Sequence, residues 1–277
     1  IKENKKDLDF FKKKISERNS SINFEDLITL DKDNRELIQQ KEKKEQEKKT
    51  LSKSKDPSNF EKSKNLSKDI DVIAKKQIFL QAKISTILSG IPNIPRDEVP
   101  IGVDEKSNQI IKQTGEVKKF NFPIKSHVEI GEKNKKIDFK TSSKLSGSRF
   151  VVLNADFALL ERALINFMLD IHTNKFFYKE ISPPLLVNEN VMFGTGQLPK
   201  FEEDQFEIKL SKDEERKFLI PTAEVVLTNL VRDSVIDHKN LPLRYVASTP
   251  CFRKEAGSYG KDTKGMMRQH QFYKVEL

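Results

Sequence analysis

The strongest constraint on the fold of this chain is a regular row of apolar residues in its first third. The row alternates gaps of four and three residues, an average of 3.5, from residue 66 to residue 87. Its members are Leu66, Ile70, Ile73, Gln77, Leu80, Ile84 and Ile87. This is the spacing of a coiled-coil seam, which a partner helix must cover. The row therefore predicts a long helix that packs lengthwise against another helix.

A second row with the same alternation lies upstream and supplies the partner. Its members are Leu27, Leu30, Asn34, Leu37, Lys41, Lys44, Lys48 and Leu51, so the middle of this row is polar. The stretch between the rows, SKSKDPSNF at 52–60, has the serines and the proline of a turn. We expect an antiparallel two-helix coiled-coil arm over about residues 27–88, with looser packing near its tip.

The arm carries much of the positive charge of the chain. Residues 1–90 hold 22 of the 51 Lys and Arg and 16 of the 42 Asp and Glu, within a net charge of +9 for the whole chain. No glycine precedes Gly90 and Pro57 is the one proline before it, which favours helix. A basic helical face either is simply solvated or grips phosphates without reading bases, and the charges alone leave both open.

A domain boundary follows the arm. The stretch SGIPNIPRDEVPIG, residues 89–102, contains three prolines and two glycines. We therefore expect one domain over 1–100 and a second over 101–277. The second shows helical periodicity over 156–174 and short strand-like runs, one of them at 148–153, joined by long loops. This pattern predicts an α+β domain built on an antiparallel sheet.

Two strand-like runs near the end of the chain carry candidate binding residues. The first run continues into CFRKEAG, where Arg253 and Glu255 are two apart and so share a strand face. In HQFYKVEL, Phe272, Lys274 and Glu276 share a face by the same rule. An arginine suits a phosphate or carboxylate, an aromatic ring can stack on a base, and a carboxylate can hold an ammonium or a hydroxyl. If the strands pair, they can form a site for ATP and an amino acid; an internal Arg–Glu ion pair is the other interpretation.

A polar insert, IPTAEVV at 220–226, interrupts another apolar run. Thr222 and Glu224 either begin a helix, with Thr222 as the N-cap, or bind a ligand, and the two roles are compatible. The connection 256–269 between the two runs of the candidate site is also unusually long and glycine-rich for a hairpin, which is typical of functional loops.

Other classes of site are disfavoured. The single cysteine, Cys251, gives neither a disulfide framework nor a cysteine zinc site, and we expect it to be a small core residue. The four histidines lack metal-ligand spacing, and GTGQLPKF at 194–201 lacks the spacing of a phosphate-binding loop. No apolar run is long enough to cross a bilayer, so we expect a cytoplasmic protein without a membrane partner.

Seven phrases, in order along the chain, resemble signatures of the bacterial type of seryl-tRNA synthetase, a class II aminoacyl-tRNA synthetase. They are IPNIP, LSGSRFVVL, ERALINFMLD, FGTGQLPKFEED, IPTAEV, TPCFRKEAGSYGKDTKG and RQHQFYKVE. The resemblance covers nearly the whole chain. It implies a coiled-coil arm that grips the long variable arm of tRNA(Ser), followed by a catalytic domain that activates serine with ATP and transfers it to the tRNA.

The resemblance also implies roles for individual residues. Arg253 is the catalytic residue and contacts the ATP α-phosphate and the serine carboxylate. The ATP-binding residues are Arg253, Lys254, Glu255 and Phe272, with Phe272 stacked on adenine. The serine-binding residues are Thr222, Ala223, Glu224, Arg253 and Glu276, with Glu276 reading the serine hydroxyl.

The same resemblance implies partners and a cofactor. Mg²⁺ accompanies ATP, no zinc is expected, and tRNA(Sec) is a further substrate. A homodimer is expected through residues about 156–187, which resemble class II motif 1.

Three departures from the family pattern stand out. Phe176-Phe177 replace a His-Gly-like pair, Val226 replaces a common proline, and motif 3 cannot be placed. From the missing motif we expect a C-terminally incomplete synthetase, inactive as this chain alone. Two alternatives remain: a non-catalytic tRNA-binding paralogue that ends naturally near 277, and a synthetase-like ligase that charges a carrier protein.

Overall fold

The computed structural model describes residues 5–18, 22–53, 59–209, 211, 215–256 and 265–277. The centre of the predicted turn at 52–60 and most of the predicted loop 256–269 lie outside these residues. The chain divides into two compact units, residues 1–116 and 117–277. Within the described residues, no helix is both long and apolar enough to cross a membrane.

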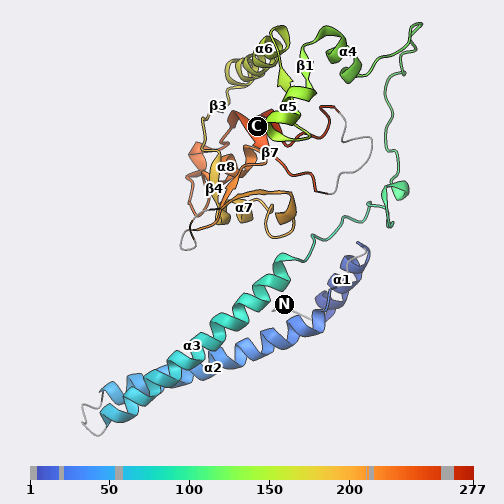
Figure 1. Cartoon of the computed structure of the whole chain (residues 1–277). Helices are drawn as coiled ribbons and strands as arrows, with labels where there is room; N and C mark the ends of the chain where they lie inside the picture. Colours follow the sequence, from blue (N-terminus) through green and yellow to red (C-terminus); the bar gives the residue numbers. More distant parts are fainter. Residues whose placement is uncertain (1–4, 19–21, 54–58, 210, 212–214, 257–264) are drawn as a thin grey trace. The chain divides into compact units, whose positions relative to one another are not determined.

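The first unit is helical and contains the predicted arm. Its helices are α1 (Lys5–Ser16), α2 (Phe24–Lys53) and α3 (Asn59–Ser89). Helices α2 and α3 lie side by side along their length (Figure 1). The residues of both predicted rows are buried or half-buried, and Leu27, Leu66 and Ile73 are the most shielded. An ion pair of 2.7 Å joins Lys44 to Asp69 across the helices. The predicted antiparallel hairpin is confirmed.

The polar residues in the middle of the α2 row affect the packing of the arm. The side-chain oxygen of Asn34 is buried without a hydrogen-bond partner among the described residues. Lys41, Lys44 and Lys48 are half-buried, so their aliphatic stems take the places that leucines hold elsewhere in the row. The most shielded apolar residue of the α2 row is therefore Leu27, at the base of this helix.

A short additional helix, α1, packs on the base of the arm. Ile15 is fully buried, and the rings of Phe11 and Phe24 meet edge to face at 5.8 Å. Lys12 forms an ion pair of 2.7 Å with Glu25 of α2. These contacts fix α1 against the start of α2.

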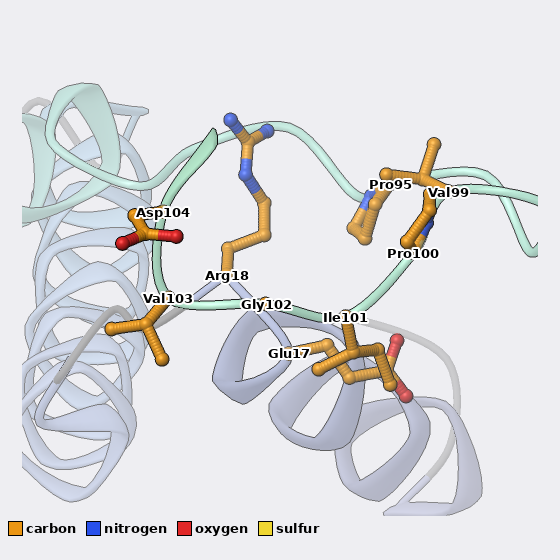
Figure 2. A pocket seen from close by; sticks show the side chains of 9 residues that line it. All are labelled: Glu17, Arg18, Pro95, Val99, Pro100, Ile101, Gly102, Val103 and Asp104. Carbon is orange, nitrogen blue, oxygen red and sulfur yellow. The ribbon is translucent and has the colours of Figure 1, made fainter. Parts of the chain in front are cut away.

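The end of α1 also holds the segment that follows α3. Lys14 pairs with Asp97 at 2.6 Å, and Arg18 donates to the carbonyl oxygen of Asn93 at 2.6 Å. A pocket of about 460 Å³ lies here, and Figure 2 shows the Arg18 side chain standing between Pro95 and Asp104. The start of the proline-rich linker is thus tied to the first unit by charged side chains.

The second unit is α+β, as predicted. Its helices are α4 (His127–Asn134), α5 (Phe139–Ser146), α6 (Asp156–Asp170), α7 (Glu189–Gly194) and α8 (Glu224–Asn229). Its strands are β1 (Ile137–Asp138), β2 (Val152–Leu153), β3 (Lys179–Glu180), β4 (Leu186–Asn188), β5 (Phe206–Ile208), β6 (Lys217–Leu219), β7 (Tyr245–Phe252) and β8 (Gln271–Glu276). A 3₁₀ turn, Glu105–Ser107, belongs to the first unit; two more, Glu202–Asp204 and His238–Asn240, lie in the second.

The sheets correct the prediction in one respect. Strands β4, β6 and β5 form an antiparallel sheet, and β7 pairs with β8 in antiparallel register. However, β3 pairs with β7 in parallel, so the sheet that carries the candidate site is mixed. About 65 residues separate β3 from β7, and parallel pairing across such a distance leaves no local sequence signal.

The predicted strand 148–153 is also shorter than expected. Only Val152 and Leu153 form β2, paired with β1. Arg149 has a φ of +64°, in the left-handed region, which a strand does not accommodate. The apolar run therefore begins as a loop and becomes a strand only in its last two residues.

Helix α6 forms where it was predicted, and a π-helical turn, Ile171–Lys175, extends it. None of its residues is buried. The exposed apolar side chains are Leu159, Leu160, Leu164, Phe167 and Met168. This helix presents an apolar stripe that the described part of the chain does not cover.

Two buried clusters support the loop between β6 and α8. The larger includes Met192, Phe218, Ile220 and Val225, and the smaller consists of Ala223, Leu227 and Ala247. The loop residues 220–223 are all buried. The loop is therefore held rigidly against β7, which places Thr222 beside the paired strands β7 and β8.

Candidate functional site

The register of β7 and β8 brings the candidate residues to one face. Opposite pairs on this face are Ala247 with Glu276, Thr249 with Lys274, and Cys251 with Phe272. Directly opposed residues of antiparallel strands lie on the same side of the sheet. The β7 members of the three pairs are fully or almost fully buried, so the β8 side chains form the accessible surface.

Thr222 joins this face from the neighbouring loop. Its side-chain hydroxyl donates to Oε2 of Glu276 at 2.5 Å and accepts from Nζ of Lys274 at 3.1 Å. Lys274 and Glu276 also form an ion pair with each other. These three side chains constitute a closed cluster of hydroxyl, ammonium and carboxylate, which we call the Thr222 cluster.

The start of α8 differs from the predicted cap. The N-cap position is Ala223, and the helix begins at Glu224. Thr222 lies one residue before the cap, and its hydroxyl oxygen accepts from the backbone N–H of Glu224 at 3.3 Å. The Glu224 side chain is exposed and makes no hydrogen bond or ion pair with another described residue. The two shorter hydrogen bonds of the Thr222 hydroxyl are thus those with Glu276 and Lys274, and the one with the Glu224 N–H is the longest.

Arg253 lies at the other end of the same face. Its Nε donates to the carbonyl oxygen of Pro221 at 3.2 Å, and its guanidinium lies over the ring of Phe272, 5.3 Å from the centroid. The terminal nitrogens of Arg253 contact no carboxylate in the described part of the chain. The planar, cationic end of the side chain is fixed by an aromatic ring and a backbone oxygen and keeps donors for an anion.

Glu255 does not share a strand face with Arg253, so that prediction is wrong. Strand β7 ends at Phe252, and Glu255 has a φ of +51°, in the left-handed region. Its carboxylate pairs with Arg268 at 3.2 Å, and its carbonyl oxygen accepts from Nη1 of Arg149 at 2.9 Å. The internal ion pair of Glu255 therefore exists, but its partner is Arg268 and not Arg253.

Lys254 is exposed beside the site. Its backbone N–H donates to the carbonyl oxygen of Asp204 at 2.9 Å, and its ammonium lies 5.8 Å from the ring centroid of Phe206. Nδ1 of His270 donates to the carbonyl oxygen of Arg253 at 2.9 Å. These contacts anchor the backbone from 253 to 254 on both sides.

Cys251 lies beneath the face, as expected of a core residue. It is fully buried, and burial raises the pKa of its thiol, partly offset by a hydrogen bond with Thr249. The pKa of Cys251 also responds to the charges of Lys274, Arg253 and Glu276. Because the thiol is buried and its pKa is raised, Cys251 is unsuited to act as a nucleophile.

The arrangement combines three kinds of recognition along the face that β7 and β8 share with the loop before α8. Arg253 offers a fork for a phosphate or carboxylate, Phe272 an aromatic surface, and the Thr222 cluster both charges and a hydroxyl. Sequence reasoning placed Lys274 on this face but gave it no role, and its contact with Thr222 has no local signal. No group of three or more His, Cys, Asp or Glu side chains is arranged to hold a metal ion among residues the structure describes.

Comparison with protein families first defines the class. Residues 205–277 match the tRNA synthetase class II core domain (G, H, P, S and T). This segment contains β5, β6, α8, β7 and β8, and with them Thr222, Arg253 and Glu276. Strands β7 and β8 and their charged face thus lie within a class II synthetase core.

Comparison with individual proteins then gives the family. The chain is 56% identical over its whole length to a serine–tRNA ligase of Pelagibacter ubique and 41% identical to one of Desulforapulum autotrophicum, and it covers 66% of each. It also resembles a solved seryl-tRNA synthetase from Pyrococcus horikoshii complexed with ATP, with a TM-score of 0.74 and 32% identity over 91% of this chain and 62% of that one. The chain belongs to the serine–tRNA ligase family. It spans about 66% of the length of these curated relatives.

Proposed function

We propose that the protein activates serine with Mg-ATP and transfers the seryl group to tRNA(Ser). The observation that carries this proposal is the charged face of β8, where an arginine over an aromatic ring lies next to a hydroxyl–ammonium–carboxylate cluster. The similarity to serine–tRNA ligases over the whole chain supports the same conclusion. The cytoplasm, where tRNA is charged, is the compartment we infer.

The proposed roles follow the positions of the side chains. Arg253 binds the α-phosphate of ATP and the serine carboxylate, because its fork is fixed and its terminal donors face no internal carboxylate. Phe272, already covered by a cation on one side, stacks on adenine. Lys254 and Glu255 lie on the ATP side, and Glu255 acts there together with its partner Arg268.

The serine side of the site is formed by the Thr222 cluster and the start of α8. Glu276 accepts a hydrogen bond from the serine hydroxyl, while Glu224 and the backbone of the segment from Thr222 to Ala223 hold the ammonium group. Glu224 is suited to this because its carboxylate is exposed and has no ion pair with a described residue. Serine is thereby recognised at three points, and its carboxylate points toward Arg253.

The chemistry requires no nucleophile from the protein. A carboxylate oxygen of serine attacks the α-phosphorus, the bond to the β-phosphate bridge breaks, and pyrophosphate leaves. A ribose hydroxyl of the terminal adenosine of tRNA then attacks the seryl carbonyl, and AMP leaves. The protein contributes positioning and stabilisation of the charge at phosphorus, which suits an arginine and fixed polar groups.

The arm supplies a surface for the tRNA. In the base-proximal half of α3, residues 72–89 contain Lys75, Lys76 and Lys83 and no acidic residue, and all three lysines are exposed. Such a surface attracts the phosphate backbone without reading sequence. We infer that this arm binds the long variable arm of tRNA(Ser), and of tRNA(Sec).

The uncovered stripe on α6 fits a homodimer through residues about 156–187. Large apolar side chains that remain exposed in one protomer, such as Phe167 at 61%, are typical of subunit interfaces. We expect sedimentation velocity to show a dimer that Phe167→Glu converts to monomer. A monomeric wild-type protein at micromolar concentration would contradict the dimer.

Amino-acid-dependent exchange between pyrophosphate and ATP tests the proposed function. The protein expressed from its complete reading frame should catalyse exchange with serine and show little with alanine or threonine. Absence of exchange together with tight binding of tRNA(Ser) would identify a non-catalytic tRNA-binding protein instead. Serine transfer to a carrier protein, with none to tRNA, would support the carrier-protein ligase. For residues 1–277 alone we expect little or no exchange.

A further inference from the structure

Lys274 has no role in the proposed reaction, yet it is central to the Thr222 cluster. It lies on β8 between Phe272 and Glu276, opposite Thr249. Its ammonium donates to Thr222 and pairs with Glu276, and its side chain is one-third exposed. A lysine that is merely solvated would not make two directed contacts with residues on two different elements.

The proposed site must distinguish serine from amino acids that lack its hydroxyl. Every amino acid carries an ammonium group, but only a hydroxyl distinguishes serine from alanine. A free carboxylate attracts the ammonium more strongly than the neutral hydroxyl, because hydrogen bonds between ions are the stronger ones. If Glu276 lacked a counter-ion, it would favour the group that all amino acids share, and discrimination would suffer.

We propose that Lys274 is a specificity-determining positioning residue that reserves Glu276 for the serine hydroxyl, an inference that rests on the proposed function of the site. The ion pair with Lys274 neutralises the Glu276 carboxylate, and the Thr222 hydroxyl fixes its Oε2. The remaining acceptor positions of the carboxylate then receive a neutral donor. The substrate ammonium is directed to Glu224, whose carboxylate has no ion pair with a described residue.

The hydrogen bonds of Thr222 support these separate roles for Glu276 and Glu224. Its hydroxyl donates its one proton to Glu276, and its oxygen accepts from Lys274 and from the Glu224 N–H. One donor and two acceptor positions are the full capacity of a hydroxyl group. Thr222 therefore orients Glu276 and Lys274, and its side chain has no capacity left for the ammonium of serine.

Equilibrium binding of L-serine and L-alanine, measured by calorimetry, tests the inference. The protein is expressed from its complete reading frame as wild type, Lys274→Met, Lys274→Gln and Lys274→Arg. We expect the wild type to favour serine, and Lys274→Met to reduce the serine-to-alanine affinity ratio by about tenfold, since Glu276 then binds either ammonium. Lys274→Arg should retain most of the ratio because it keeps the charge.

Lys239→Met and Lys274→Gln serve as controls. Lys239→Met removes an exposed lysine far from the cluster in sequence and should leave the ratio unchanged. Lys274→Gln keeps a donor for Thr222 without the charge, and it replaces the methionine variant if thermal unfolding shows that the latter does not fold. An unchanged ratio in the uncharged variant, or equal loss of serine and alanine binding, would overturn the role of Lys274. A wild type that binds serine no better than alanine would overturn the proposed function as well.

Discussion

Arg253→Ala is expected to reduce serine-dependent ATP–pyrophosphate exchange by about 100- to 1,000-fold. Removal of one preorganised donor to a developing charge has an effect of this order in other enzymes. The guanidinium of Arg253 is held by Pro221 and Phe272, so it needs no reorganisation when the α-phosphate arrives. The measurement is the initial rate of exchange at saturating serine and ATP, with the protein expressed from its complete reading frame.

Two variants control for charge and for folding. Arg253→Lys keeps the charge but loses the planar fork, so most of the reduction in rate should remain. Arg244→Ala removes an exposed arginine just before β7 and should leave exchange unchanged. The thermal midpoint of Arg253→Ala should be close to that of the wild type, because Arg253 is only half-buried. Exchange at the wild-type rate in Arg253→Ala would refute its role.

Replacement of residues 31–86 by a short Gly-Ser linker is expected to weaken tRNA(Ser) binding by about 100-fold. Removal of two hydrogen bonds to phosphate, each charged and of about 1.5 kcal/mol, is sufficient for this. Exchange with serine and ATP should persist, because the Thr222 cluster and Arg253 lie in the second unit. Filter binding of tRNA and the exchange assay, on the same preparation, give the two readouts.

A variant that loses charge but keeps the helices tests whether the lysines of the arm bind the tRNA. Substitution of Lys75, Lys76 and Lys83 by glutamine keeps the helix and removes three exposed charges. Each lysine that no longer neutralises a phosphate should reduce the slope of log affinity against log salt by about one. Unchanged tRNA affinity in the linker variant would disprove the arm as a tRNA-binding element, whereas an unchanged slope in the lysine variant would place the phosphate-binding residues elsewhere on the arm.

The parts of the fold that could be predicted are those with a local period. The row from Leu66 to Ile87 predicted both the length of α3 and the face it buries, because each turn of the helix repeats the same signal. Helix α6 was predicted in the same way, although its apolar stripe is exposed. Periodicity shows that a helix face must be covered, but it does not show whether the same chain or another chain covers it.

The site was predictable only where strand alternation determines it. Alternation placed Phe272 and Glu276 on one face, and the register of β7 and β8 agrees. It failed at Glu255, because β7 already ends at Phe252 and Glu255 is a non-glycine residue in the left-handed region. It also could not show that Thr222, 52 residues before Lys274, closes the cluster, since that contact depends on the tertiary fold.

The most direct test of the proposed site is a crystal structure of the protein with a non-hydrolysable seryl-adenylate analogue. We expect the seryl hydroxyl within about 3.2 Å of the Glu276 carboxylate, the phosphate mimic on Arg253 and the adenine on Phe272. Lys274 should remain paired with Glu276. An analogue bound away from β8, or with its hydroxyl turned from Glu276, would contradict the assignment of this face as the serine and ATP site.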